Sequence, residues 1–197
     1  PVNTVSWGDA ARFVNWLHNG QPTGAQDATT TEDGAYTLNG ATDDSTLSTV
    51  ARNAAAIWFI PSENEWYKAS YHKNDGVTGN YWDYSTGSDS APGRDLTEAT
   101  NPGNNANYYG DPYPIDDTYY TTEMGEFNQS DSPYGTFDQN GNVDEWTEAS
   151  GSSQRYRRGG GFGSGAKDAT YRWPNAPSTQ QQDIGFRVAA TPAPQSY

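Results

Sequence analysis

The pattern of hydrophobic and polar positions predicts two helices and a few short strands in a largely irregular chain. The first predicted helix, residues 6–20, carries apolar side chains at helical spacing: Ala10, Phe13, Val14 and Leu17. Ser6 and Asp9 have the spacing of a capping box, and Gly20 follows the last periodic position. We therefore expect the helix to begin after Ser6 and to end at the glycine.

A strand followed by a second helix is predicted from residue 57 onward. Residues 57–60, "IWFI", have the character of a buried strand, which Pro61 ends. Ser62 and Glu65 then form a second capping-box pattern. The helix that this pattern begins carries Trp66, Ala69 and Lys73.

Two long stretches show no helical periodicity. Residues 21–50 are rich in Thr, Asp, Gly and Asn, and within them "GAYTLNG" is typical of a short hairpin arm. Residues 74–144 are dense in Gly, Pro, Asn, Asp, Ser and Tyr. A loop of this length inside a domain needs its own source of order, and recurring aromatic side chains or bound cations would supply it.

Composition narrows the class of protein. A length of 197 residues suits one domain, and with 32% apolar but 14% aromatic residues the core has to depend on Trp, Tyr and Phe. A formal net charge of −14 argues against nucleic acid and anionic membrane surfaces as partners. No apolar run is long enough to cross a bilayer, so membrane insertion is not expected.

Carboxylates and cysteines bear on the possible chemistry. Carboxylates in Gly- and Asn-rich loops are ligands that Ca²⁺ selects, although on composition alone an acidic soluble surface is the more common explanation. The chain contains no cysteine, which excludes disulfides, thiolate zinc sites and cysteine nucleophiles. The low Lys content and abundant Thr, Asn, Gly and Asp are compatible with a secreted bacterial protein.

Five segments in register extend over nearly the whole chain: "PVNTVSWGDAARFVNWL", "FIPSENEWYKAS", "SPYGTFDQNGNVDEWTE", "RRGGGFGS" and "DIGFRVAA". In order and spacing they are similar to the formylglycine-generating-enzyme (sulfatase-modifying factor) family. The resemblance implies an α+β, C-type-lectin-like fold with two helices, a small twisted antiparallel sheet and much irregular structure. One domain over residues 1–190 is expected, followed by a Pro-rich tail at 191–197. Members usually carry an earlier segment that this chain lacks, so we expect a fragment of a longer precursor.

The resemblance also implies structural calcium. One site would use the side chains of Asn142 and Glu145 with the carbonyl oxygens of Gly141 and Val143. The alternative is an Asn-Gly turn with Glu145 in solvent. A second site would draw on Asn107, the Tyr108 carbonyl, Asp116 and the Thr118 carbonyl, with Asp117 as a substitute for Asp116.

The positions that carry catalysis in the family are changed. Formylglycine-generating enzymes bind copper with two cysteines, and the matching places here are Ser164 and Ala169. Neither residue offers the soft sulfur that Cu(I) requires, which excludes that mechanism. Related iron enzymes need a histidine cluster, whereas this chain has only His18 and His72, both expected at solvated helix ends.

What remains near the former active site is a candidate ligand groove formed by Tyr171, Arg172 and Trp173. Exposed aromatic side chains with an arginine are typical of binding hot spots. Core packing is the alternative, and we expect it for Phe162, Trp173 and Phe186, while Tyr171 and Arg172 stay open.

These patterns predict a non-catalytic, calcium-stabilised, extracellular binding or structural module of a bacterium. Its partner would be a protein or a glycan, and it could form a homo-oligomer or assemble with the missing N-terminal segment. The alternatives are self-assembly into a cell-surface matrix, hypervariable ligand binding through residues 162–183, and a metal-dependent enzyme of another type.

Overall fold

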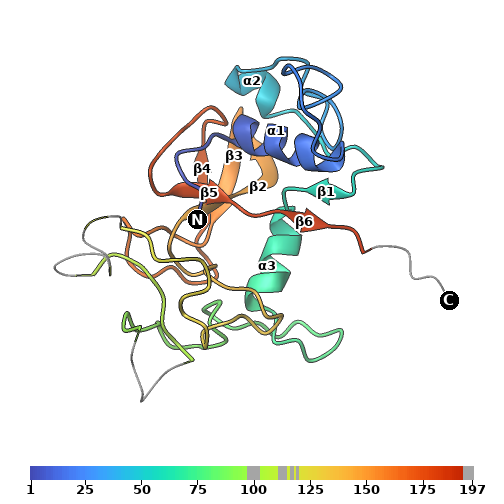
Figure 1. The fold of residues 1–197 in the computed structure, drawn as a ribbon. Helices are drawn as coiled ribbons and strands as arrows, with labels where there is room; N and C mark the ends of the chain where they lie inside the picture. Colours follow the sequence, from blue (N-terminus) through green and yellow to red (C-terminus); the bar gives the residue numbers. More distant parts are fainter. Residues whose placement is uncertain (97–102, 111–114, 116–117, 119, 193–197) are drawn as a thin grey trace.

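The computed structural model describes residues 1–96, 103–110, 115, 118 and 120–192, and it has the predicted α+β composition (Figure 1). Within these residues the elements are α1 (Trp7–His18), α2 (Asp44–Leu47), β1 (Trp58–Phe59), α3 (Glu63–Tyr71), β2 (Asp144–Gly151), β3 (Gln154–Arg158), β4 (Trp173–Asn175), β5 (Ile184–Phe186) and β6 (Ala189–Ala190). Helix α1 lies beside the sheets, and the irregular segment that follows α3 gathers on the other side of them (Figure 1). The candidate functional site lies where this irregular segment leads into β2.

Two small sheets organise the regular half. The four-stranded sheet has the order β4-β3-β2-β5, and β1 pairs with β6 in a second sheet. The β2–β3 hairpin turns at Ser152 and Ser153, whose positive φ angles of 50° and 61° match the twist of the flanking strands. β5 runs parallel to β2, with Glu145 opposite Gly185, so the sheet is mixed where an antiparallel one was predicted. The final apolar segment divides into β5 and β6 and so joins both sheets.

Both predicted helices begin at their capping boxes. The Ser6 hydroxyl oxygen accepts from the Asp9 backbone N–H at 3.0 Å, and the Asp9 carboxylate accepts from the Ser6 N–H at 2.9 Å. Ser62 and Glu65 form the same reciprocal pair at α3. α3 ends at Tyr71, two residues before Lys73, which the prediction had included.

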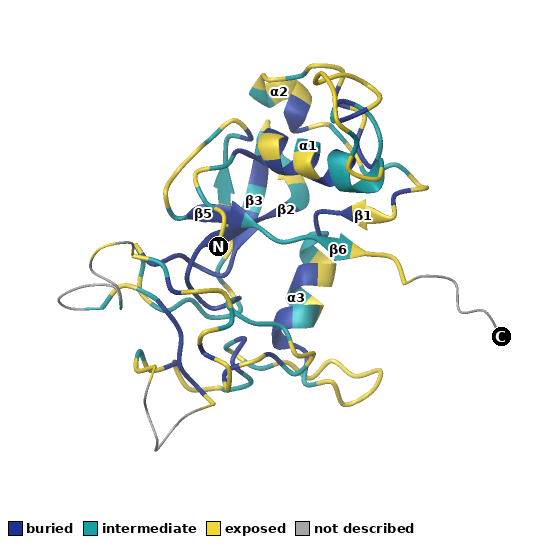
Figure 2. Cartoon of the chain, viewed as in Figure 1, coloured by how far each residue is buried: buried dark blue, intermediate teal, exposed yellow. Residues whose placement is uncertain are grey.

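The core is aromatic, as composition predicted. Trp7, Tyr36 and Trp146 are fully buried within one cluster of apolar side chains. The rings of Trp7 and Tyr36 meet edge to face with centroids 5.5 Å apart. Buried residues follow α1 and the central strands (Figure 2).

A buried cation holds the segment around α2, a helix that the sequence did not predict. Arg155 is only 2% exposed, and its guanidinium lies 3.7 Å from the centroid of the Trp7 ring. It donates from Nη2 to the Leu47 carbonyl at 2.7 Å and from Nη1 to the Glu148 carbonyl at 2.5 Å. Burial lowers the pKa of Arg155 to about 10, and the three-way contact fixes the end of α2 against the sheet.

The irregular stretches agree with the prediction in most respects. Within the described part of residues 74–143 no helix or strand occurs. The hairpin arm expected at "GAYTLNG" is reduced to one antiparallel bridge between Tyr36 and Arg52. Hydrogen bonds to side chains hold the described part of residues 74–143, the irregular half of the molecule. One example runs from the Ser85 backbone N–H to the Asn140 Oδ1 at 3.1 Å.

Candidate functional site

The turn at Gly141 and Asn142 is the centre of the first predicted calcium site. The Asn142 backbone N–H donates to the Asn107 carbonyl at 2.7 Å, and Asn142 has a φ of 66°. The Asn107 carbonyl lies so close to Gly141 that a Cβ atom there has no room. The positive φ and the close approach explain why glycine and asparagine occupy these positions.

The side chains of Asn142 and Asn107, predicted for two separate sites, meet in one network. Asn142 Oδ1 accepts from the Thr122 backbone N–H at 3.0 Å and from Asn107 Nδ2 at 3.3 Å. Asn142 Nδ2 donates to the Thr122 carbonyl at 3.2 Å. The Asn142 carboxamide therefore faces protein partners, and as a side-chain ligand for a cation it does not fit.

Glu145 is a buried carboxylate, 5% exposed, so the alternative in which it faces solvent is wrong. Its Oε2 accepts from Trp66 Nε1 at 2.6 Å and from Arg187 Nε. Its Oε1 accepts from Arg187 Nη2 at 2.6 Å. A carboxylate offers about four lone-pair positions, so three hydrogen bonds leave room for one more contact on Glu145.

Asp138 is a second carboxylate beside Glu145 that the sequence interpretation missed. Its Oδ2 accepts from the Gly125 backbone N–H at 2.6 Å. Burial, with the nearby charge of Glu145, raises the pKa of Asp138. The signal was present, because Asp138 directly precedes the "QNGN" turn and adopts a left-handed φ of 62°.

Asp138 and Glu145 share the wall of a mainly apolar groove of about 650 Å³, to which Asp9 and Asn142 also contribute. Its apolar lining includes Val2, Val5, Phe13, Met124, Phe137, Phe186 and Val188. Arg187 also lies in this wall and partly neutralises the two carboxylates. Oxygen ligands for a hard cation are thus available here from Glu145, Asp138 and the adjoining backbone.

The second predicted calcium site is only partly described. Asp116 and Asp117 lie outside the described residues, whereas Thr118 lies within them. The Tyr108 carbonyl accepts from Arg94 Nε at 2.9 Å, so a guanidinium already lies beside that oxygen. Among the described residues no group of three or more His, Asp or Glu side chains gathers as a metal site.

Backbone bonds anchor Ser164 and Ala169, the two positions that the family resemblance matched to copper-binding cysteines. The Ser164 carbonyl accepts from the Tyr109 N–H at 2.8 Å, and the Ser164 hydroxyl donates to the Gly161 carbonyl at 3.2 Å. The Ala169 N–H donates to the Asp83 carbonyl at 2.7 Å. These bonds leave the loop well anchored without any sulfur ligand.

Charged side chains fix the loop between these positions and β4. Arg158 Nη1 donates to the carbonyls of Ala169 and Tyr171 at 3.1 and 3.0 Å. Glu63 pairs with both Arg158 and Arg172, at 2.7 Å in each case. The Arg172 guanidinium also lies 3.3 Å from the centroid of the Tyr156 ring.

The three residues of the predicted ligand groove differ in their exposure to solvent. Tyr171 is half-buried, Arg172 is exposed but paired, and Trp173 is 54% exposed, so the expected core packing of Trp173 is wrong. Phe162 is buried as expected, and Phe186 is partly buried against the core. Trp173 lies on β4, the edge strand of the four-stranded sheet.

Beneath this loop lies Asp144, a buried carboxylate of β2. Its Oδ2 accepts from Arg157 Nη1 at 2.7 Å and from the Tyr171 hydroxyl at 3.2 Å. Its Oδ1 accepts from the Gly160 N–H at 2.9 Å. Burial raises the pKa of Asp144 to about 6, since desolvation outweighs the opposing charge of Arg157, and the charge of Asp183 adds to the rise.

The two histidines differ from each other. His18 Nδ1 accepts from the Ile57 N–H at 3.1 Å at the end of α1. His72 is buried, with Nδ1 2.8 Å from the Tyr134 hydroxyl, so its expected solvation is wrong. Neither histidine belongs to a metal-binding cluster in the part of the chain that the structure describes.

Comparison with known proteins adds three findings. A family model described as the sulfatase-modifying factor enzyme 1-like domain matches residues 1–192. The crystal structure of CarF aligns with a TM-score of 0.63 and 22% identity, covering 98% of this chain and 68% of CarF. Treponema denticola variable protein 1 aligns with a TM-score of 0.62 and 20% identity, covering 98% of this chain and 71% of that protein.

No curated protein sequence matches the chain. The two structural likenesses support the C-type-lectin-like α+β fold, which was predicted from the motifs. In the part that the structure describes, no helix has the length and apolar character that crossing a bilayer requires.

The raised pKa of Asp144 predicts how the stability of the fold changes with pH. Because its folded pKa of about 6 lies above the ordinary 3.8, Asp144 stabilises the fold most at low pH, and this contribution is lost as pH rises through about 6. Its carboxyl ¹³C shift in an NMR titration should change with a midpoint near pH 6. Tyr171→Phe removes a hydroxyl donor that favours the ionised form, so the midpoint should rise further.

Tyr134→Phe is the matched control, since its hydroxyl contacts His72 and not Asp144. A midpoint near pH 4 in the wild type, or a fall of the midpoint in Tyr171→Phe, contradicts the assignment.

Proposed function

Because the chain belongs to the family of sulfatase-modifying factor enzyme 1-like domains, we propose that it is a non-catalytic, calcium-stabilised binding or structural module outside a bacterial cell. The observation that carries the proposal is the pair Ser164 and Ala169 at the two places where related enzymes have copper-binding cysteines. Both residues are anchored through their backbones, so the frame of the former catalytic loop persists without its chemistry.

The non-catalytic part is tested with Cu(I) and a cysteine-containing peptide under oxygen. Mass spectrometry should detect no copper-dependent conversion of the cysteine by the wild-type chain, since it has no thiolate to hold Cu(I). The matched variant Ser164→Cys/Ala169→Cys should gain Cu(I) binding, because the anchored loop would present two thiolates. Copper-dependent oxidation by the wild-type chain would overturn the proposal.

Calcium is the second part of the proposal. Glu145 and Asp138, with the carbonyl oxygens of Gly141 and Val143, would hold the cation, and Asp138 takes the place that the sequence interpretation gave to Asn142. When bound, calcium would supply positive charge that joins the irregular segment to β2. The carboxylates of Asp138 and Glu145 in one wall and a net charge of −14 support this choice, while Arg187 limits the affinity. The site at Asn107, Tyr108, Asp116 and Thr118 stays a prediction.

Thermal unfolding tests the calcium proposal. At about one hundred times Kd, a bound ligand adds about 2.7 kcal/mol, which corresponds to a rise in Tm of roughly 5–10 °C for a chain of this size. Asp138→Asn should reduce the rise strongly, because it removes one of the two charges. Asp75→Asn, on an exposed loop remote in sequence, should retain it.

A Tm that is the same in EDTA and in excess calcium would show that the cation is not structural. A calcium-dependent rise that survives in Asp138→Asn would place the cation elsewhere.

The binding role is supported by the surface around β4. Trp173 presents an exposed ring next to Arg172, which stacks on Tyr156, and these side chains suit a protein or glycan ligand. Glu63 accepts a hydrogen bond from Arg172 and holds its side chain in place. Binding a ligand would therefore cost little conformational entropy at Arg172. Hypervariable ligand binding through residues 162–183, self-assembly into a matrix and homo-oligomer formation remain alternative hypotheses for the same surface.

A further inference from the structure

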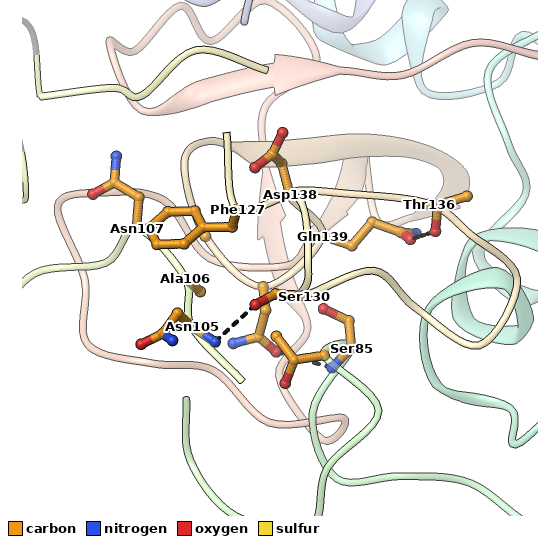
Figure 3. Close-up of a pocket in the computed structure, with 12 residues that line it drawn as sticks. Ser85, Asn105, Ala106, Asn107, Phe127, Ser130, Thr136, Asp138 and Gln139 are labelled. Carbon is orange, nitrogen blue, oxygen red and sulfur yellow. Dashed lines mark hydrogen bonds between the residues drawn. The ribbon is translucent and has the colours of Figure 1, made fainter. Parts of the chain in front are cut away.

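A small polar cavity lies inside the irregular half of the molecule. It is formed by residues 85–86, 105–107 and 127–141, which come from three segments of the chain (Figure 3). Its volume of about 10 Å³ is close to the least that one water molecule needs. Ser, Thr, Asn and Gln residues form much of its lining, so the cavity is not of the apolar kind that stays dry.

Two carboxamide groups in this lining have nitrogen atoms without a hydrogen-bond partner. They are Asn140 Nδ2 and Gln139 Nε2, and each residue is 2% exposed. The orientation of Asn140 is fixed, because its Oδ1 accepts from the Ser85 backbone N–H at 3.1 Å. Turning the amide over would set its NH₂ group against that N–H, so the unpartnered atom of Asn140 is a donor.

The groups in the cavity wall determine which ligand can accept a hydrogen bond from Asn140 Nδ2. An amide N–H needs an acceptor, which excludes a metal cation as its direct partner. The net charge of −14 carried by the chain disfavours an anion. A neutral acceptor of the size of one water molecule fits both conditions and the volume.

We propose that the cavity binds one ordered water, which accepts a hydrogen bond from Asn140 Nδ2. The water has two hydrogens to donate, and Thr86 Oγ1 is an acceptor in the wall, because its own O–H donates to Asn104 Oδ1 at 2.6 Å. The water thereby joins the 85–86 loop to the segment that precedes β2.

Water–protein cross-relaxation measured by NMR tests the proposal on the wild-type chain in EDTA. The Asn140 side-chain NH₂ should show a cross-peak to water with the sign of a long-lived bound molecule. Asn15 is the matched control, since its buried Nδ2 already donates to the carbonyls of Thr31 and Tyr36 and should show none. No cross-peak at Asn140, or an equal one at Asn15, overturns the proposal.

A high-resolution crystal structure, with one crystal in EDTA and one soaked in bromide, gives the independent readout. One peak of water density within hydrogen-bond distance of Asn140 Nδ2 in both crystals is the expected result. An empty cavity, a peak that EDTA removes, or an anomalous bromide peak in the cavity contradicts it.

Discussion

The ion pair between the buried Glu145 and the partly exposed Arg187 is the contact on which the arrangement of the two halves depends. Glu145 lies on β2, its second donor Trp66 lies on α3, and Arg187 follows β5. Arg187 Nη2 also donates to the Phe137 carbonyl at 3.0 Å, so the same guanidinium reaches the irregular half. Removing one partner of such a pair leaves an uncompensated buried charge, which costs about 3–5 kcal/mol.

Around this pair, directional polar contacts provide much of the stabilisation that apolar packing provides in most domains. The chain has only 32% apolar residues, and the apolar cluster joins α1 and the sheets to residues 35–56. The irregular half is held by carboxamide and backbone bonds, of which the link between Asn107 and Asn142 is the central one. Such contacts are specific in direction, and a long loop ordered by them can keep one conformation without becoming a helix or a strand.

The sequence was sufficient for features that depend on local spacing. The capping boxes at Ser6 and Ser62 fixed where both long helices begin, and the motif order fixed the family and the fold. It was insufficient where a distant partner decides the outcome. α2 begins at a local N-cap, Asp43, but its end is held by Arg155, more than one hundred residues away, and the direction of β5 depends on the path of the loop before it.

The same distinction between local spacing and distant partners applies to the candidate site. Ser164 and Ala169 are candidate positions counted along the chain from the glycine run, whereas the burial of Glu145 depends on Trp66 and Arg187, which are distant in sequence. Native-state hydrogen exchange tests most directly the claim that polar contacts order the irregular half. The Asn142 amide, bonded to the Asn107 carbonyl, should exchange within about tenfold of the slowest amides of α1, through global unfolding. Exchange about a thousandfold faster would show that the irregular half opens on its own, and would contradict this account.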